Sequence, residues 1–205
     1  MSKTRLIGKT DKLIKDLYLS EVSAKSIAAK LSLSLKQVYT SLIRQKVNRR
    51  RPQEQNRIHF LNKPLSYLYF KPKTEKFKLL EIAALMLYKG EGAKNGCTVD
   101  FVNSDEQALK IFINYLRKIC RVNEKRIKFY LYCFSDQDPV LLTKFWSKTL
   151  MVNPQAFTKP YVRNLNNTKA RRTMNNGVLH IRYSDKKLLN HILTLIDQIA
   201  KKMIK

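Results

Sequence analysis

Apolar residues recur at helical spacing between residues 10 and 46 and predict three short helices there. The first runs near residues 11–19, the second follows Ser23, and the third runs from Ser34 to about residue 46. Serine is a favoured N-cap because its oxygen accepts a hydrogen bond from a free backbone N–H of the first turn. The expected inward residues of the three helices are Leu13, Ile14 and Leu17, then Ile27, Ala28 and Leu31, then Val38, Leu42 and Ile43.

The most apolar stretch of the chain is residues 82–88, where every position is apolar. A helix that is apolar all round is expected to be buried on all sides. It is expected to stop at Gly90 and Gly92, because glycine tolerates the positive φ of a helix end. Glu91 stands between them, where the helix dipole already places negative charge, so a cation should compensate it. The candidates are a divalent metal ion and two lysines, Lys89 and Lys94.

From residue 76 onward, helix and strand patterns alternate. Strands are expected at residues 97–102, 126–134 and 177–183, and helices near 106–120, 139–150 and 185–203. The helix at 139–150 is expected to pack through Leu141, Leu142, Phe145 and Trp146. In the strand at 126–134, Ile127, Phe129, Leu131 and Cys133 should share one face. The strand at 177–183 should be half-buried, with Leu179, Ile181 and Tyr183 on the face opposite Val178, His180 and Arg182. The pattern predicts an α+β domain over residues 76–205 with a mostly antiparallel sheet and packed helices.

Residues 52–75 are poorly periodic and contain Pro64 and Pro72, which predicts a linker after a first domain of residues 1–51. Part of the linker should dock on the second domain, because it contains a run of apolar residues, Tyr67, Leu68, Tyr69 and Phe70.

The net charge of the chain indicates which kind of binding partner to expect. The 205 residues include 41 Lys and Arg against 15 Asp and Glu, a formal net charge of +26. Such an excess attracts polyanions, and phosphate neutralisation makes nucleic acid the leading partner. A ribosome-associated or merely basic protein is the alternative, and a membrane surface is not expected.

Two clusters of basic residues are candidate phosphate contacts. Arg49, Arg50 and Arg51 precede Pro52 and suit an arm along a backbone or in a minor groove, or else a solvated linker. Lys169, Arg171 and Arg172 lie in an Asn-rich stretch expected to be a loop that orders on nucleic acid.

The three cysteines are widely spaced and form no zinc or disulfide pattern. The N-terminus has no long apolar core of a signal peptide, and no run approaches the about 18 apolar residues of a membrane span. A reducing cytoplasm is expected, with the protein on the nucleoid.

The two helices at 23–46 resemble a helix-turn-helix, with Ala28 at the helix crossing, Leu33 in the turn and Ser32 where that motif usually has glycine. In such motifs the second helix enters the major groove. Its expected DNA-contacting residues are Lys36, Gln37, Thr40, Ser41 and Arg44. A small helical bundle with a solvated polar face is the alternative.

Residues 84–92 resemble the LAGLIDADG motif of homing endonucleases, with Leu85 and Leu87 at apolar positions, Gly90 at a small one and Glu91 at the acid. The resemblance implies that Glu91 binds Mg²⁺ in a nuclease and that two such helices pack side by side. A chain with one motif must therefore form a homodimer. The implied interface residues are Ala83, Ala84, Leu87 and Gly90.

The resemblance also implies a concave sheet whose inward side chains read DNA, with Arg182 as the basic residue that helps catalysis. His180 shares its strand face and is a candidate phosphate contact. Two features depart from the family: Met86 stands where a small residue is usual, and residues 92–105 are too short for the long first hairpin of cleaving members. A carboxylate neutralised by lysine is the alternative for Glu91.

Three functions follow. The first is a sequence-specific double-stranded DNA-binding protein that acts by occupancy, similar to bacterial sporulation regulators that join these two domains without cleaving. The second is a metal-dependent homing-type DNA endonuclease with Mg²⁺ as cofactor. The third is an RNA-binding splicing factor, which the helix-turn-helix disfavours.

Overall fold

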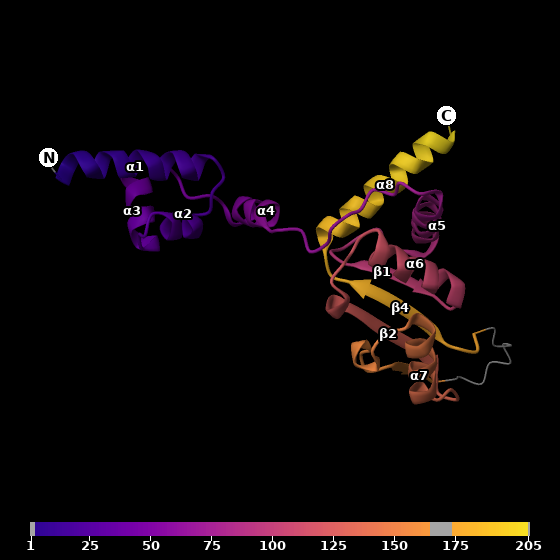
Figure 1. Cartoon of the computed structure of the whole chain (residues 1–205). Coiled ribbons are helices and arrows are strands. Elements are labelled where there is room, and N and C mark those ends of the chain that lie inside the picture. The colour runs from indigo at the N-terminus through magenta and orange to yellow at the C-terminus, as the bar shows by residue number, and fades with distance from the viewer. Residues whose placement is uncertain (1–2, 165–173, 205) are drawn as a thin grey trace. The chain divides into compact units, whose positions relative to one another are not determined.

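The computed structural model describes residues 3–164 and 174–204, with only the backbone of residues 3–7. The chain forms two compact units, Met1–Pro64 and Leu65–Lys205 (Figure 1). The predicted loop cations Lys169, Arg171 and Arg172 lie outside the described residues.

The first unit contains three helices that pack around one small core, α1 (Lys3–Leu19), α2 (Ala24–Lys30) and α3 (Leu35–Arg44), followed by α4 (Pro52–Asn62). Ser23 and Ser34 cap α2 and α3 as predicted, and Gln37 completes a capping box with Ser34. The core contains Ile14, Tyr18, Ala24, Ile27, Ala28, Val38 and Leu42. In the turn between α2 and α3, Ser32 adopts φ 53°, a left-handed conformation that glycine accommodates more easily.

Three predictions of side-chain burial in this unit were wrong: Leu13 and Ile43 were expected to be buried, and Ser41 was expected to be exposed. Leu13 is 46% exposed and Ile43 is 65% exposed, whereas Ser41 is 1% exposed. The helix phase of α3 places Val38, Ser41 and Leu42 together on its inner side. Ser41 is accommodated there because its hydroxyl donates a 2.7 Å hydrogen bond to Oδ1 of Asp11.

The predicted linker divides between the two units. Residues 52–62 form α4, with Pro52 in the first turn and Ile58 as its buried residue. Proline suits a helix start because its missing N–H has no intrahelical partner there. Residues 65–70 instead dock on the second unit, where the backbone N–H groups of Leu68 and Phe70 donate to the carbonyls of Cys120 and Ile119.

The second unit contains one four-stranded sheet and its covering helices. The helices are α5 (Glu75–Glu91), α6 (Glu106–Lys118), α7 (Pro139–Leu150) and α8 (Lys186–Ile204), with short 3₁₀ turns at Glu124–Arg126 and Pro154–Ala156. The strands are β1 (Val99–Asn103), β2 (Ile127–Phe134), β3 (Tyr161–Arg163) and β4 (Val178–Tyr183).

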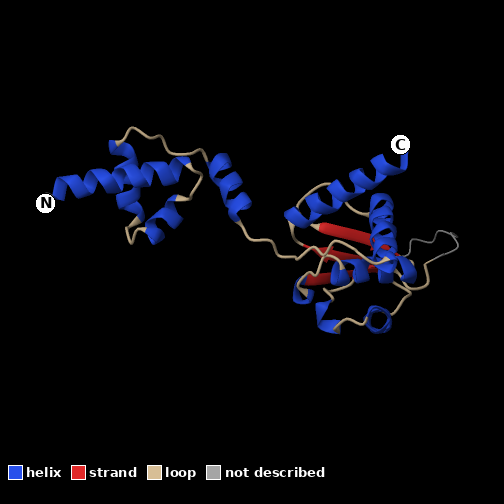
Figure 2. Ribbon diagram, turned by 45° about the horizontal axis from the view of Figure 1, so that its top comes forward, coloured by secondary structure: helices blue, strands red, loops and turns tan. Residues whose placement is uncertain are grey.

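The strand order is β1-β4-β2-β3, with β4 antiparallel to both neighbours and β3 parallel to β2. The α+β class is therefore observed, with a mixed sheet. The predicted alternation is confirmed, because Ile127, Phe129, Leu131 and Cys133 are buried together with Leu179, Ile181 and Tyr183. Figure 2 shows the helices of this unit gathered around the strands. Leu141, predicted to pack, is 61% exposed, and Leu142 and Trp146 carry the packing of α7.

Helix α5 is not buried on all sides. Ala84, Leu85 and Tyr88 are buried in the core of the unit, whereas Leu79 is 59% exposed and Ala83 is partly exposed. Ala84 was predicted to lie in a dimer interface; with no exposed surface, it packs within its own chain instead. Leu87 is partly buried against the same core, while a Cβ on Gly90 would meet no atom within 4 Å.

The end of α5 depends on Gly92 for a reason other than positive φ. Gly92 has φ −83°, which any residue adopts. A Cβ at this position would lie 2.5 Å from the ring of Tyr88. The backbone therefore passes so close to Tyr88 that no side chain fits.

A partly buried polar cluster joins the docked segment to α5 and α8. The hydroxyl of Tyr69 donates to Oε1 of Glu81 at 2.8 Å, and the rings of Tyr69 and His191 are 4.5 Å apart. Burial raises the pKa of Glu81 and lowers the pKa of His191. We therefore expect the stability of this unit to depend on pH.

Among the helices that the structure describes, none is both long and apolar enough to cross a membrane.

Candidate nucleic-acid interface

One face of the sheet carries polar, basic and aromatic side chains in place of a hydrophobic core. Successive side chains of a strand point to opposite faces, so the residues between the buried ones share this face. They include Asp100 and Val102 from β1, Lys128, Tyr130 and Tyr132 from β2, and His180 and Arg182 from β4. We call this set the polar sheet face.

An acid and two basic side chains lie together on the polar sheet face. Nδ1 of His180 lies 3.0 Å from Oδ1 of Asp100, and Nε of Arg182 lies 3.1 Å from Oδ2 of the same carboxylate. The Arg182 contact is an ion pair whose angle falls outside that of a hydrogen bond. Asp100 is cross-strand partner of Arg182, so sheet register alone brings the two together.

Tyrosine rings extend this cluster across β2 to the edge strand β3. The Arg182 guanidinium lies 4.8 Å from the ring centroid of Tyr130. The ring of Tyr132 is 4.5 Å from His180 and 5.3 Å from Tyr161. A protonated histidine and an arginine bind phosphate oxygens, while tyrosine faces bind cations or stack on bases. The arrangement therefore offers both kinds of contact that a nucleic acid needs.

The carboxylate of Asp100 holds both basic side chains in one orientation. Its relative side-chain exposure is 17%, and that of Arg182 is 38%. The guanidinium therefore still presents N–H donors to solvent, because only its Nε faces the carboxylate. The register of Asp100 opposite Arg182 gives it a positioning role that the strand pattern does not reveal.

Glu91, the predicted metal ligand, is exposed at the end of α5. Neither predicted lysine compensates it: Nζ of Lys94 donates to the carbonyl of Gly90 at 3.2 Å, and no ion pair with Lys89 is found in the described part of the chain. Across residues 8–164 and 174–204, no group of three His, Cys, Asp or Glu side chains is arranged to hold a metal ion. One chain thus places a single carboxylate at this position, which does not fit a complete Mg²⁺ site.

The outer surface of α3 carries most of the residues predicted to contact DNA. Lys36, Gln37, Thr40 and Arg44 are exposed, whereas the buried Ser41 is not available to DNA. Oε1 of Gln37 accepts a 2.8 Å hydrogen bond from the N–H of Ser34, so the amide is oriented by the cap. Arg44 donates to Asp11 at 3.0 Å but keeps half of its side chain exposed.

The three consecutive arginines do not form a free arm. The guanidinium of Arg50 lies 3.8 Å from the ring centroid of Tyr18 and donates to the carbonyls of Tyr18 and Val22. Arg50 therefore fastens the chain after α3 to the core, which corrects its predicted role as a phosphate contact. Arg49 is exposed and lies 4.2 Å from the ring centroid of Tyr39, and Arg51 is exposed at the N-cap of α4.

Several residues of the interface were not singled out in the sequence. Tyr161 and Arg163 belong to β3, a three-residue strand that is too short to give a period, so the sequence carried no signal for their register. Asp11 orients α3 from a distant helix, and no local pattern marks such a contact.

No protein-family model matches the chain, and no curated protein or solved structure does.

Proposed function

We propose that this chain is a sequence-specific double-stranded DNA-binding protein with a LAGLIDADG-like second unit, acting by occupancy and without efficient cleavage. The observation that supports the proposal best is the polar sheet face. There Asp100 orients His180 and Arg182 toward the side of the sheet that no core occupies. A sheet that presented this face only to water would gain little from aligning a histidine and an arginine beside tyrosine rings.

The first unit supports the same partner. Its two capped helices and the exposed Lys36, Gln37, Thr40 and Arg44 on α3 fit a helix that enters the major groove. Glutamine and arginine are the side chains that contact adenine and guanine edges. Arg49 and Arg51 add exposed positive charge at the end of the helix pair. Duplex DNA is favoured over RNA, because the major groove of an RNA helix is too narrow for a helix to enter.

The proposed assembly is a homodimer through the outer side of α5. Leu79, Ala83 and Gly90 lie on one side of this helix, at spacings of four and seven residues. They are partly or fully exposed, and Gly90 leaves open space where a second backbone can approach. A twofold dimer matches a palindromic DNA site.

A metal-dependent homing-type endonuclease is the second candidate, favoured by one observation. Glu91 remains an exposed carboxylate at the negative end of a helix, with no ion pair in the described part of the chain. One chain does not supply a full set of metal ligands, so Mg²⁺ binding here requires a second copy, and no catalytic step is assigned to Arg182 or Glu91.

Incubation of the wild type with a pooled duplex library and Mg²⁺ or Mn²⁺ separates the two candidates. The proposal predicts retained, uncut DNA. Metal-dependent double-strand breaks that disappear in Glu91→Gln, with binding preserved, would establish the nuclease instead. Glu91→Gln is a suitable variant because it keeps the shape and removes the charge that attracts a metal ion.

A further inference from the structure

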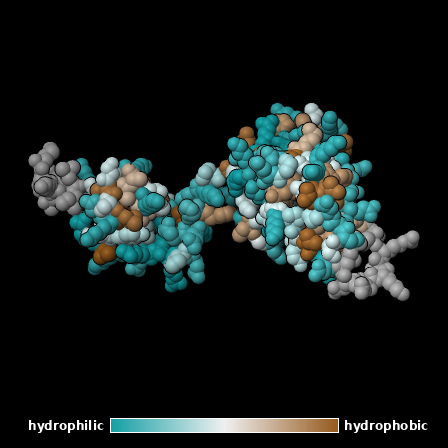
Figure 3. All heavy atoms as spheres, turned by 90° about the horizontal axis from the view of Figure 1, so that it is seen from below, coloured by the Kyte–Doolittle hydropathy of each residue, from teal (hydrophilic) through white to brown (hydrophobic). Residues whose placement is uncertain are grey.

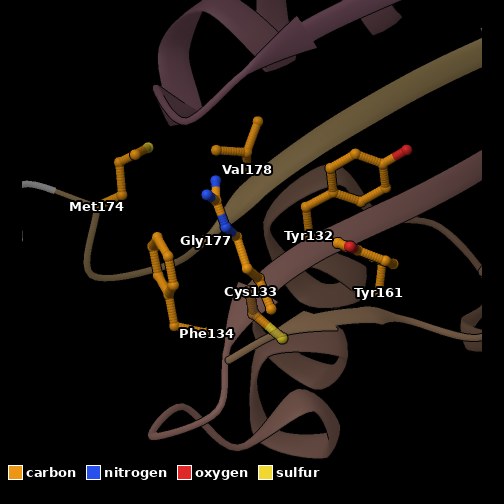
Figure 4. Close-up of a pocket in the computed structure, with 8 residues that line it drawn as sticks. Tyr132, Cys133, Phe134, Tyr161, Met174, Gly177 and Val178 are labelled. Carbon is orange, nitrogen blue, oxygen red and sulfur yellow. The ribbon is translucent and has the colours of Figure 1, made fainter. Parts of the chain in front are cut away.

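A pocket of about 380 Å³ opens at the β3 edge of the sheet. Its lining residues are Tyr132, Cys133, Phe134, Tyr161, Arg163, Met174, Gly177 and Val178. Figure 4 shows Tyr132 and Tyr161 on one side of it and Phe134 and Met174 on the other. Pockets of this size, mostly apolar with few polar groups, are typical binding sites for small planar ligands or parts of larger ones.

The pocket is continuous with the polar sheet face. Tyr132 and Tyr161 are cross-strand partners, and so are Phe134 and Arg163. Their side chains therefore emerge on the face that also carries His180 and Arg182. Tyr132 belongs to both features, since its ring is 4.5 Å from His180 and 5.3 Å from Tyr161.

One wall of the pocket includes Met174, and side chains outside the pocket hold the backbone of residues 174–176 in place by hydrogen bonds. Nε2 of Gln137 donates to the carbonyls of Met174 and Asn175 at 3.1 and 2.8 Å. Nε1 of Trp146, a fully buried side chain, donates to the carbonyl of Asn176 at 2.8 Å. These contacts preform the wall without a ligand, which lowers the entropy lost on binding.

The floor of the pocket requires glycine at position 177. Gly177 has φ 66°, and a Cβ there would lie 2.5 Å from the carbonyl oxygen of Tyr132. The backbone just before β4 thus approaches β2 closely at the pocket.

We propose that this pocket takes an unpaired nucleobase of the bound DNA, an inference that rests on the proposed function. Three features specify the ligand. Aromatic side chains line the site, exposed Tyr132 and Tyr161 among them, and bases stack on such rings. Arg163 supplies positive charge beside the pocket, in a chain of net charge +26. A paired base inside a duplex cannot reach such a pocket, so the base must leave the stack.

Figure 3, coloured by hydropathy, shows a face of the second unit that is largely hydrophilic with separate hydrophobic patches. A local apolar site in a chain of net charge +26 matches the chemistry of a nucleotide, whose base is flat and weakly polar and whose phosphate is charged. The pocket therefore binds the base while His180 and Arg182 bind the flanking phosphates.

The test compares three duplexes of the same sequence, using the full chain at one low salt concentration. One duplex is fully paired, one carries a single unpaired adenine, and one carries an abasic unpaired nucleotide that bends as easily but has no base. The inference predicts that the unpaired adenine binds about tenfold more tightly than the abasic duplex, the size of effect expected from stacking one base on an aromatic ring. Fluorescence anisotropy gives the three affinities.

Substitutions in the chain test whether the preference for the unpaired adenine arises in the pocket. Tyr132→Leu should remove the preference for adenine over the abasic duplex, and Tyr132→Phe, which keeps the ring, should retain it. Tyr130→Leu is the matched control: it removes a tyrosine from the same strand and face but outside the pocket, and should weaken all three duplexes alike. Thermal unfolding checks that each variant is folded.

Three results would overturn the inference. If the adenine and abasic duplexes bind equally well while the paired duplex also binds, the base pocket is wrong and the DNA-binding proposal survives. A preference that persists in Tyr132→Leu would place the base elsewhere and also reject the pocket. If no duplex binds at any salt concentration, the proposed function and this inference both fail.

Discussion

The ring of Tyr88 occupies the space that a side chain on Gly92 would need, since a Cβ there would lie 2.5 Å from three ring atoms. The hydroxyl of the same tyrosine donates to the carbonyl of Ala93 at 2.7 Å and accepts from the N–H of Asp100 at 3.3 Å. Tyr88 therefore ties the end of α5 to the strand that carries Asp100. The end of α5 and the strand that carries the acid of the polar sheet face are therefore joined through one side chain.

Gly92→Ala should lower the free energy of unfolding by about 1–3 kcal/mol, because the buried Tyr88 ring has no room to move away. Gly90→Ala is the matched control: its Cβ meets no atom, and alanine favours helix over glycine by about 1 kcal/mol. Urea denaturation of the two variants measures both changes. Equal effects would show that the close approach of Tyr88 is not what requires glycine.

Ser41 and Arg44 should separate stability from DNA recognition, although both contact Asp11. Ser41→Ala should lower the free energy of unfolding by about 1 kcal/mol, because the partly buried carboxylate of Asp11 loses the hydroxyl donor of a buried serine, and should leave base preference unchanged. Arg44→Ala should relax base choice at one position by about 1–3 kcal/mol with little loss of stability. Gln37→Ala should also relax base choice, but should in addition lower the free energy of unfolding by about 1 kcal/mol, because it removes the capping-box hydrogen bond to Ser34.

Denaturation and binding-site selection on the same samples give both quantities. An altered base preference in Ser41→Ala would contradict the assignment of Ser41 to the core. Uniform weakening across all sequences in Arg44→Ala would reduce Arg44 to a phosphate contact.

His191 should make the stability of the protein fall as the pH is lowered. Burial lowers its pKa in the folded chain below 6.5, so the unfolded chain takes up a proton first. The stabilisation contributed by neutral His191 is therefore present above about pH 6.5 and is lost as the pH falls through the lowered folded value.

Unfolding measured in urea at pH 7.5 and 5.5 should show a smaller difference in His191→Gln than in the wild type. His59→Gln provides the matched control, because His59 is exposed on α4. An unchanged pH dependence in His191→Gln would show that burial of this imidazole has no energetic consequence.

The homodimer prediction concerns the outer side of α5. Light scattering at micromolar concentration should report twice the mass of the chain, and Ala83→Glu should give a monomer, because a charge at a closely packed helix contact has no partner. Lys118→Glu, an exposed change on α6, should remain dimeric. A wild-type monomer with and without DNA would exclude this interface and leave Glu91 without a second acid.

The sequence predicted the elements whose apolar residues follow a clear period. The alternation of β2 and β4 placed Leu131 and Ile181 inward correctly, and the serine caps marked the starts of α2 and α3. It did not predict α4, whose residues show no apolar stripe and which buries Ile58 as a short helix.

The candidate site was harder to predict because its contacts are not local. Asp100, Arg182 and Tyr132 come from three strands, and only the sheet register brings them onto one face. Arg50 looked like a phosphate contact because a run of arginines carries no sign of the Tyr18 ring beneath it. Ser41 looked outward because a polar residue on a helix gives no indication of a distant carboxylate partner.

The most direct test of DNA binding is a salt titration of duplex affinity for the full chain and for Arg182→Gln. If the polar sheet face and α3 neutralise about six to ten phosphates, affinity should fall about 10³- to 10⁵-fold between about 50 and 200 mM salt. The slope of log affinity against log salt should decrease by about one in Arg182→Gln, which removes one phosphate contact. An affinity that barely changes across the titration, or a slope that Arg182→Gln leaves unaltered, would contradict the account.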